Sequence, residues 1–483
     1  MEKYKVTIGL EIHAELRTRT KMFCDSKNDP DEKRPNVNIC PVCMGHPGTL
    51  PVINKEAVKH VLKIGAAVGG TVADFTEFDR KNYFYPDIPK GYQISQYKYP
   101  LVLGGTINGI KLTRIHLEED TARSSHETGD YSLVDFNRAG VPLMEMLTEP
   151  VIGSAEEAVS FAKEFQLLLQ YTGVSDANME KGEMRVEVNI SVSDTDKFGT
   201  KVEVKNLNSF RVVERAIAYE IARHIEVIER GENVVQETRG WDETKNKTFS
   251  QRSKENAHDY RYFPDPDLPK LMISEIPEFS AEVLRKSLPE LPWEKRERYE
   301  KSFGLQKKIV NFLVDNPVYA HFFESAIVGV EKDKKIVELT ANYLVSDIVG
   351  IVNKPQGAGI ESMKVSEAAI GGLTPQNLAV TIAMISSGEL SSRGAKDLIA
   401  EALVSGKDAR VIAQEKDLIQ KSDAGELATI IAGIISENKK VVDEYKAGKQ
   451  ASLQFLIGQG MRATKGSANP EMLKAILLEQ LSK

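Results

Sequence analysis

The stretch Val6–Leu16, VTIGLEIHAEL, alternates between apolar and polar or small residues along its whole length. Successive side chains of a β-strand point to opposite faces, so this period predicts a strand with two unlike sides. One side would carry aliphatic residues, and the other would carry Glu11, His13 and Glu15. Charged side chains on one face of an otherwise apolar strand predict a sheet with one buried face and one polar face.

A second region of the chain repeats this alternation. In Arg185–Val192 the residues Arg185 and Glu187 share the polar side, and Lys201–Lys205 continues the pattern. Ser193–Thr200 between them is rich in turn-forming residues, which predicts an antiparallel hairpin. The sequence therefore predicts a sheet with one apolar and one densely charged face. A charged face that simply meets solvent remains an alternative.

The character of the chain changes at Pro292. Residues 1–291 show mixed strand and helix patterns, whereas the later residues give one amphipathic helix after another. Thr374-Pro375 and Asn469-Pro470 predict helix starts, and Gly406 is expected just beyond a helix end. At roughly 100–200 residues per domain, a chain of 483 residues makes about two to four domains.

The bulk composition excludes several classes of protein. A net charge of −7 argues against non-specific coating of nucleic acid, which needs clustered cations, although it leaves room for a local RNA-binding patch. The sequence has no apolar run of about 18 residues and no apolar leader, so we expect no membrane contact and a cytoplasmic protein. Three cysteines do not suggest a disulfide framework. Walker A and G-x-G-x-x-G motifs are absent, so any ATP site must be of another type.

Several acidic and imidazole side chains could hold a divalent cation. Glu11 and His13 share one strand face, the segment His116–Asp120 is acidic, and Glu145 interrupts the apolar stretch Val141–Leu147. A carboxylate in such a stretch is costly to bury unless a cation or basic partner accompanies it. Oxygen-rich sites with one imidazole suit Mg²⁺ or Mn²⁺ better than Zn²⁺. An exposed strand face is the competing interpretation.

Three segments mix cations with aromatic residues or amides. Asp79–Asp87 contains Lys81, Tyr83 and Tyr85, and Asp259–Asp267 has a similar composition. Such segments could contact phosphate or stack on a ring, although a rim of aromatic packing would explain them too. The third segment ends a strand with groups that could face an anion: Lys205, Asn206, Asn208, Ser209, Phe210 and Arg211.

The cysteines have partial metal-ligand spacing. Cys24 is followed by Cys40 and Cys43 in a Cys-x-x-Cys pair, and thiolates select Zn²⁺. A tetrahedral structural site would need a fourth ligand, for which His46, Asp25 and Asp29 are candidates. Three unpaired thiols without metal are the alternative.

Seven segments, taken in order, resemble motifs of the B-subunit family of tRNA-dependent amidotransferases. Each motif is weak alone, but the resemblance runs from about residue 4 to the end of the chain. The segments are Ile8–Leu16, Phe78–Asp87, Tyr92–Gln96, His116–Asp120, Lys205–Phe210, Asp259–Pro264 and Gly458–Pro470.

The resemblance implies an α+β fold class. It predicts an antiparallel-sheet cradle similar to glutamine synthetase and guanido kinases over residues 1–291, which would bind ATP and Mg²⁺. An all-α helical domain over 292–409 and an all-α, YqeY-like tail domain over 410–483 would follow. Residues 439–474 include seven cationic and three anionic side chains. We therefore expect the tail to bind tRNA by recognising its shape rather than its base sequence.

The resemblance also implies an activity, that of a carbon–nitrogen ligase with glutamine as amide donor. Such a subunit uses ATP to phosphorylate the side-chain carboxylate of Glu-tRNA(Gln) or Asp-tRNA(Asn), and ammonia then displaces phosphate. The expected partners are an amidase A subunit and a small C subunit in a heterotrimer, the mischarged tRNA and the mischarging synthetase. A non-catalytic tRNA adaptor and a small-molecule ATP-dependent ligase or kinase are the competing functions.

Matching positions imply specific roles. Mg²⁺ is expected at His13, Glu119 and Glu145 with Glu11 adjacent; Glu118 is the less favoured neighbour, although alternation alone does not choose between the two. Zinc-bearing family members usually show Cys-x-Cys before the later pair, whereas this chain has Ser26, so a structural zinc at Cys24, Cys40 and Cys43 stays open. The expected nucleotide contacts are Lys81, Tyr83, Tyr85, Asn206, Ser209 and Phe210, with Arg185 and Glu187 as weaker candidates on the same polar face.

Overall fold

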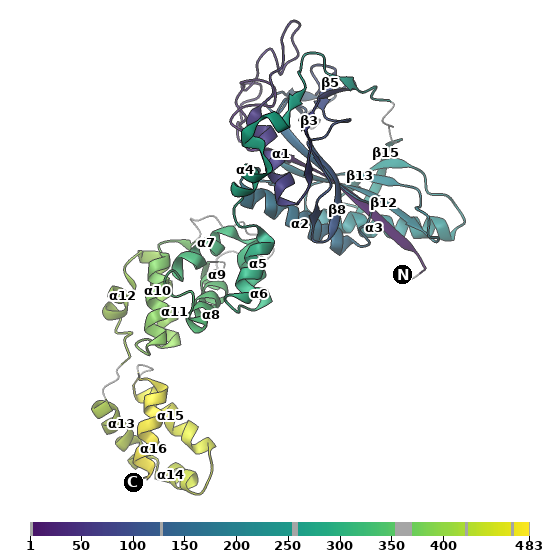
Figure 1. The fold of residues 1–483 in the computed structure, drawn as a ribbon. Coiled ribbons are helices and arrows are strands. Elements are labelled where there is room, and N and C mark those ends of the chain that lie inside the picture. Colours follow the sequence, from purple (N-terminus) through teal and green to yellow (C-terminus); the bar gives the residue numbers. More distant parts are fainter. Residues whose placement is uncertain are drawn as a thin grey trace. The chain divides into compact units, whose positions relative to one another are not determined.

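The computed structural model describes residues 3–125, 129–253, 259–352, 370–420, 424–464 and 468–482. The chain divides into two compact units, 1–292 and 293–483. The first unit combines sheet and helix and the second is helical, as the expected α+β fold class requires (Figure 1). Residues 465–467 of the predicted tail motif, Lys465 among them, lie outside the described residues.

A ten-stranded sheet forms the centre of the first unit. Its neighbouring strands pair antiparallel except for one parallel pair, β13 with β14, so the sheet is mixed rather than wholly antiparallel. The predicted hairpin is confirmed, because β12 pairs antiparallel with β13. The order across the sheet is β15 (Lys247–Ser253), β14 (Glu237–Asp242), β13 (Val202–Leu207), β12 (Met184–Ser193), β1 (Lys5–Glu15), β11 (Pro142–Thr148), β8 (Ile110–Glu119), β6 (Val102–Leu103) and β2 (Thr71–Val72), with β7 (Thr106–Ile107) also paired to β8.

Helices cover the apolar face of this sheet. The helix α2 (Ala155–Thr172) contacts β1 and β7, and α3 (Phe210–Glu229) contacts β12, β13 and β15 (Figure 1). The apolar sides of β1 and β12 are fully buried; Ile8, Ile12 and Val188 each have 0% exposure. Each such aliphatic side chain contributes about 1.5–3 kcal/mol. The alternation in the sequence is therefore the signature of this buried layer.

The helix α1 (Lys55–Ala67) packs on the other end of the sheet. Asn54 caps it by accepting hydrogen bonds from the backbone N–H groups of Glu56 and Ala57. A Cβ at Gly65 would lie 2.5 Å from Cγ2 of Val102 in β6, so only glycine allows this close approach. A short helix, α4 (Ala281–Lys286), contacts α1.

Small sheets flank the main one. The three-stranded sheet carries parts of the predicted cation–aromatic segments, because Phe263 and Pro264 in β16 pair with β4, and the N–H of Asn82 donates a hydrogen bond to the Tyr260 carbonyl. The small sheets are β16 (Phe263–Pro264) with β4 (Asp79–Asn82) and β5 (Tyr92–Ser95), β17 (Leu271–Met272) with β3 (Phe75–Thr76), and β10 (Leu133–Asp135) with β9 (Arg123–Ser125).

The second unit consists of helices with the expected caps. Thr374 caps α10, Gly406 has the left-handed conformation after α11, and Pro470 opens α16. The helices are α5 (Pro292–Lys301), α6 (Lys307–Asp315), α7 (Pro317–Ala326), α8 (Lys334–Asn342), α9 (Val349–Val352), α10 (Pro375–Ser386), α11 (Ser392–Ser405), α12 (Ala409–Glu415), α13 (Ala424–Glu437), α14 (Lys439–Lys446), α15 (Ala451–Ala463) and α16 (Pro470–Ser482).

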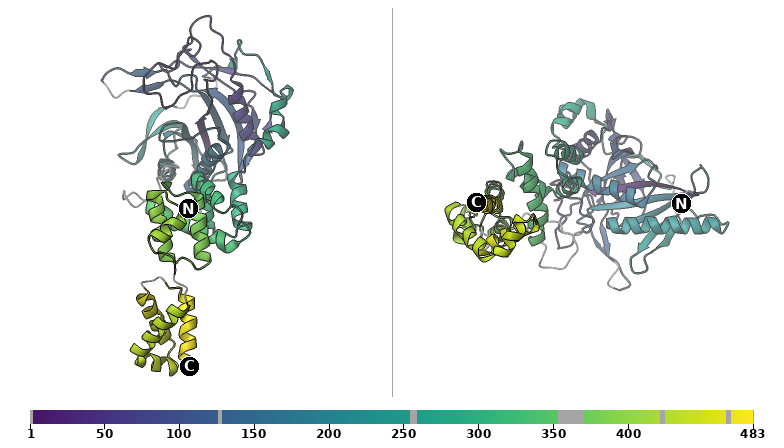
Figure 2. Two further views of the ribbon diagram at one scale, coloured as in Figure 1. Left: turned by 90° about the vertical axis from the view of Figure 1, so that its left-hand side faces the viewer. Right: turned by 90° about the horizontal axis from the view of Figure 1, so that it is seen from below.

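The last four helices share one core. Leu427, Ile431, Leu456, Leu473 and Leu477 are buried together, and Figure 2 shows α13–α16 as a compact bundle. A domain boundary at 409/410 would fall in the first turn of α12, whereas a boundary between α12 and α13 would leave both helices whole. The division of the helical part into two domains remains a prediction.

Candidate functional site

The polar face of the main sheet carries a row of charged side chains. His13 in β1 lies opposite Glu145 in β11, which lies opposite His116 in β8. On the other side of β1, His13 lies opposite Arg185 in β12. Residues directly opposite each other in a sheet share one face, so strand register alone brings these four side chains together.

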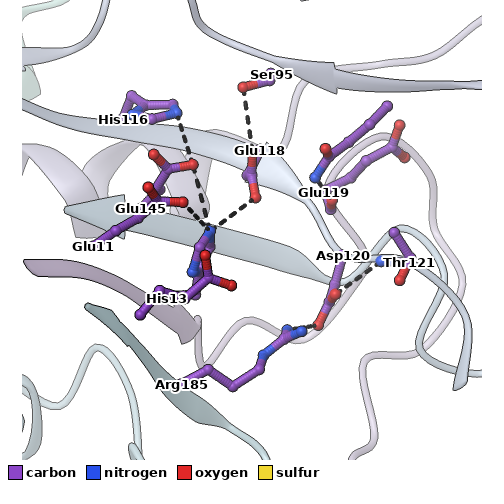
Figure 3. Close-up of polar contacts among 12 residues, drawn as sticks. Glu11, His13, Ser95, His116, Glu118, Glu119, Asp120, Thr121, Glu145 and Arg185 are labelled. Atoms are coloured by element: carbon purple, nitrogen blue, oxygen red, sulfur yellow. Dashed lines mark hydrogen bonds and ion pairs between the residues drawn. The ribbon is translucent and has the colours of Figure 1, made fainter. Parts of the chain in front are cut away.

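The centre of this row is a carboxylate–histidine cluster, made of Glu11, His13, His116, Glu118 and Glu145. The Nε2 atom of His13 lies 3.4 Å from Glu145, 3.7 Å from Glu118 and 3.8 Å from Glu11 (Figure 3). The Nε2 atom of His116 lies 3.5 Å from Glu145. Three carboxylates packed this closely in a buried site need compensating positive charge.

The protonation equilibria of the cluster reflect that need. Burial, and then repulsion from Glu145, raises the pKa of Glu11 to about 8 and that of Glu118 to about 7. Burial would lower the pKa of His13, but its contact with Glu145 raises it to about 9. Burial lowers the pKa of His116 to about 4. Without a bound cation, protons on Glu11, His13 and Glu118 therefore offset part of the negative charge that a cation could offset.

The donor set of the cluster fits a hard divalent cation. Two triads each bring their ligand atoms within 4.8 Å of one another: Glu11, His13 and Glu145, and His116, Glu118 and Glu145. Carboxylate oxygens with an imidazole suit Mg²⁺ or Mn²⁺. Glu145 belongs to both triads and is the shared ligand candidate.

Glu118, the less favoured of the two candidate metal ligands, lies on the side of β8 that faces His13, whereas Glu119 lies on the other side. Glu118 points toward His13, and Glu119 points away from it (Figure 3). The Glu119 carboxylate lies 2.5 Å from Nζ of Lys90 and accepts a hydrogen bond from the backbone N–H of Ile94 at 2.9 Å. Neighbouring residues of a strand face opposite ways, and the pairing of β8 with β11 gives the cluster side to Glu118.

Arg185 and Glu187 both lie on the polar face, and each has an oppositely charged neighbour. Arg185 forms a close ion pair with Asp120. Glu187 lies 2.7 Å from Nζ of Lys205, which also approaches Glu203. Both residues border the cluster. Glu187 shares Lys205 with Glu203, and carboxylate oxygens of Glu11, Glu187 and Glu203 lie within 4.8 Å of one another.

Lys81 lies in β4 among aromatic rings near the cluster. Its Nζ atom is 4.9 Å from the ring centre of Tyr260 and 5.8 Å from that of Tyr83. Burial would lower the pKa of Lys81, but Tyr262 and Glu118 hold it well above the usual value. The ammonium group therefore stays charged beside the carboxylates. Tyr85 is 48% exposed at the start of the following loop.

The third predicted segment joins β13 to α3. Asn206 is exposed and has the left-handed conformation, with φ of 59°. Ser209 caps α3 by accepting a hydrogen bond from the N–H of Val212 at 3.2 Å. The Phe210 ring lies 5.8 Å from Nζ of Lys163 in α2, the helix that covers the apolar face. The structure thus places Phe210 in the helical layer rather than beside the cluster.

The three cysteines converge. Their sulfur atoms lie within 4.8 Å of one another, which fits three thiolate ligands of zinc. The group includes no histidine or carboxylate among the described residues, so His46, Asp25 and Asp29 are not part of it. The Sγ atom of Cys43 lies 3.9 Å from Oγ of Ser26 and 3.7 Å from Nζ of Lys21.

Sequence reasoning missed His116 as a member of the cluster. His116 and Glu118 are two residues apart in a strand, so their shared face was available from the sequence. Their position opposite Glu145 depends on register, which the sequence does not display. Asp120 was likewise missed as the partner of Arg185.

The fold and the site together define a class of protein. It has a sheet covered by helices on one face, a buried carboxylate–histidine cluster with the donor set for a divalent cation on the other, and a helical unit that follows along the chain. The family model described as the GatB/GatE catalytic domain matches residues 6–277, and the one described as the GatB domain matches residues 321–481. The chain belongs to the GatB/GatE family.

Curated relatives match along the whole chain. The B subunit of aspartyl/glutamyl-tRNA(Asn/Gln) amidotransferase from Thermoanaerobacter pseudethanolicus is 44% identical over 491 residues, which is 100% of both chains. The protein of the same name from Persephonella marina is 43% identical over 489 residues, covering 99% of this chain and 100% of the relative. Among the described residues, no helix combines the length and apolarity that a membrane crossing requires.

Proposed function

We propose that this chain is the ATP-using subunit of a tRNA-dependent amidotransferase. It would phosphorylate the side-chain carboxylate of Glu-tRNA(Gln) or Asp-tRNA(Asn), and ammonia would then displace the phosphate to give the amide. The observation that carries the proposal is the buried carboxylate–histidine cluster with Lys81 beside it. The names of the relatives, which give an aspartyl/glutamyl-tRNA(Asn/Gln) amidotransferase, support it.

The residues of the cluster would hold Mg²⁺ through His13, Glu118 and Glu145, with Glu11 adjacent. The ion, when bound with ATP, supplies charge neutralisation at the transferring phosphate. Lys81 adds a fixed positive charge at the same side of the sheet. A free carboxylate resists attack by ammonia because oxide is a poor leaving group, whereas phosphate leaves readily. Precise placement of these charges is the main contribution a protein makes to phosphoryl transfer.

Partners are part of the proposal. The relatives are named as the B member of a multi-subunit enzyme, so we expect an amidase A subunit as the ammonia source and a small C subunit. The tail helices would contact the tRNA, and the mischarging synthetase is a further candidate partner. Zinc at the three cysteines would have a structural role, and the cytoplasm is the expected compartment.

The test uses the reconstituted complex with ammonium chloride in place of glutamine, so that the amidase reaction is not needed. We expect ATP-dependent conversion of both mischarged tRNAs by the wild type and at least a 100-fold loss in His13→Ala. His321→Ala is the matched control, because His321 is exposed in α7. Conversion by His13→Ala at the wild-type rate, or conversion without ATP, would contradict the proposal. ATP hydrolysis that ignores mischarged tRNA would favour a small-molecule ligase or kinase instead.

A further inference from the structure

Five tyrosines form a continuous run of ring contacts beside the cluster. Their ring centres lie 5.9 Å apart from Tyr85 to Tyr83, 5.8 Å from Tyr83 to Tyr260 and 6.1 Å from Tyr260 to Tyr262. The last contact differs from the others, because Tyr262 and Tyr97 stack nearly parallel, with centres 4.4 Å apart and an interplanar angle of 13°. The earlier contacts are edge-on.

The stacked pair ends the run with an open ring. Tyr97 is 45% exposed, while Tyr262 is half-buried beneath it. Parallel stacking offers the outer face of Tyr97 to another planar ring. Packing within the protein explains the inner ring but not the exposure of the outer one.

One cation, Arg114, lies beside this open ring, and Lys98 is the next residue along the chain. The guanidinium carbon of Arg114 lies 5.9 Å from the Tyr97 ring centre, and Nη1 of Arg114 donates a hydrogen bond to the Tyr97 carbonyl at 3.3 Å. Lys98 is exposed, and its Nζ atom lies 5.1 Å from the ring centre of Tyr99. Neither cation forms an ion pair within the described part of the chain. An aromatic platform with a cation beside it is the chemistry that binds unpaired nucleotides, since bases stack and phosphates need charge.

The inner part of the run reaches the site of the proposed reaction. The Tyr83 hydroxyl donates a hydrogen bond to Oε1 of Gln93 at 3.3 Å, and Nε2 of Gln93 donates to the Glu119 carbonyl in β8, the strand that carries Glu118, at 2.7 Å. Lys81 lies against Tyr83 and Tyr260. A nucleotide stacked on Tyr97 would therefore be anchored at the end of a surface that leads to the cluster.

We propose that the exposed face of Tyr97 stacks against an adenine, and that this adenine is the terminal base of the tRNA acceptor end. This inference rests on the proposed function, in which the reacting aminoacyl group is attached to that terminal nucleoside. The adenine of ATP is the other source of the same chemistry, and the experiment separates the two.

The test measures dissociation constants of the reconstituted complex for one tRNA with and without its 3′-terminal adenosine. We expect the wild type to bind the shortened tRNA about 10-fold more weakly, the scale of one base stacked on an aromatic ring. Tyr97→Ala should bind both tRNAs equally and at the weaker level, while the KM for ATP stays within about 2-fold. Tyr97→Phe should retain the preference, because stacking uses the ring and not the hydroxyl.

Two controls keep the result specific. Tyr97→Leu retains apolar volume without a π-face, so it should also lose the preference; a preference kept in Tyr97→Leu would overturn the stacking assignment. Tyr131→Ala removes another exposed tyrosine and should behave as the wild type does. A raised KM for ATP with unchanged tRNA affinity in Tyr97→Ala would assign the ring to ATP and overturn the inference. If the Tyr97→Ala complex transamidates normally and still prefers the tRNA with its terminal adenosine, this inference alone is refuted. If the wild-type complex does not transamidate, the proposed function is refuted.

Discussion

Glu118 and Glu119 provide a matched pair for testing the site. They are adjacent in β8, and conversion of either to glutamine removes one negative charge at nearly constant volume. Glu118 faces His13 at 3.7 Å, while Glu119 faces Lys90 at 2.5 Å on the other side of the strand. We expect Glu118→Gln to weaken metal binding without lowering stability, and Glu119→Gln to lower stability with little effect on metal binding.

The magnitude for Glu118→Gln follows from the distance in the cluster. One carboxylate charge 3.7 Å from a cationic centre, the separation seen to His13, contributes about 4 kcal/mol at an effective dielectric constant of about 20. Desolvation offsets part of this, which leaves about 3 kcal/mol, or about 100-fold weaker binding of the divalent ion. Stability of the metal-free protein should not fall, because burial and Glu145 already raise the pKa of Glu118 to about 7.

The magnitude for Glu119→Gln comes from the ion pair. Removal of one partner of a buried pair leaves Lys90 uncompensated and costs about 3–5 kcal/mol. The exposed fractions of the two side chains are 12% for Lys90 and 6% for Glu119, so solvent screening reduces this cost only in part. Metal affinity should change by less than about 5-fold, because the Glu119 carboxylate is not a member of either triad.

Two measurements decide the question. Titration with Mn²⁺, followed by electron paramagnetic resonance, gives the metal dissociation constant of the complex, and urea unfolding of the metal-free chain gives its stability. The assignment of Glu118 to the metal site is refuted if both variants bind Mn²⁺ equally, or if Glu119→Gln binds it more weakly than Glu118→Gln.

Three further outcomes follow from other parts of the chain. Gly65→Ala should destabilise the protein, because the clash with Val102 costs about 1–3 kcal/mol and exceeds the gain of about 1 kcal/mol in helix propensity. In a Val102→Ala background the same substitution should be stabilising. Urea unfolding of the wild type, the two single variants and the double variant checks this. Burial would raise the pKa of Glu220, but hydrogen bonds, including those from Arg223, lower it to about 2. The ionised carboxylate therefore stabilises the fold fully above pH 4.5, and the free energy of unfolding should fall by about 3 kcal/mol as the pH drops toward 2. Glu220→Gln should remove that part of the pH dependence, and an unchanged acid-unfolding curve would contradict it. Deletion of 424–483 should raise the KM for mischarged tRNA while glutamine hydrolysis by the partner persists; unchanged tRNA affinity would count against a tRNA-binding tail.

Local patterns in the sequence predicted much of the secondary structure. The alternation of Val6–Leu16 corresponds to β1 (Lys5–Glu15), and Thr374-Pro375 opens α10. Strand alternation and helix caps depend on residues within a few positions of one another, so the sequence alone is enough to predict them. The shared face of Glu11 and His13 follows from the same short-range geometry.

The predicted nucleotide contacts depend on side-chain positions that short-range sequence patterns do not specify. Phe210 follows a polar turn in the sequence, yet it is the first residue of α3 and its ring lies beside Lys163. Arg185 has the correct face, but Asp120 neutralises it. Both outcomes depend on side chains that are distant in the sequence, which propensities do not specify.

By itself, the sequence determined which residues of each strand share a face, where helices begin and end, and, through its ordered motifs, the family. The tertiary structure alone decided that Glu145 lies between His13 and His116, and that Glu118 rather than Glu119 joins them. The physical reason is that the period of a strand is fixed by local backbone geometry, whereas the register between strands is set by packing of the whole sheet, and a shift of one residue reverses the face of every side chain.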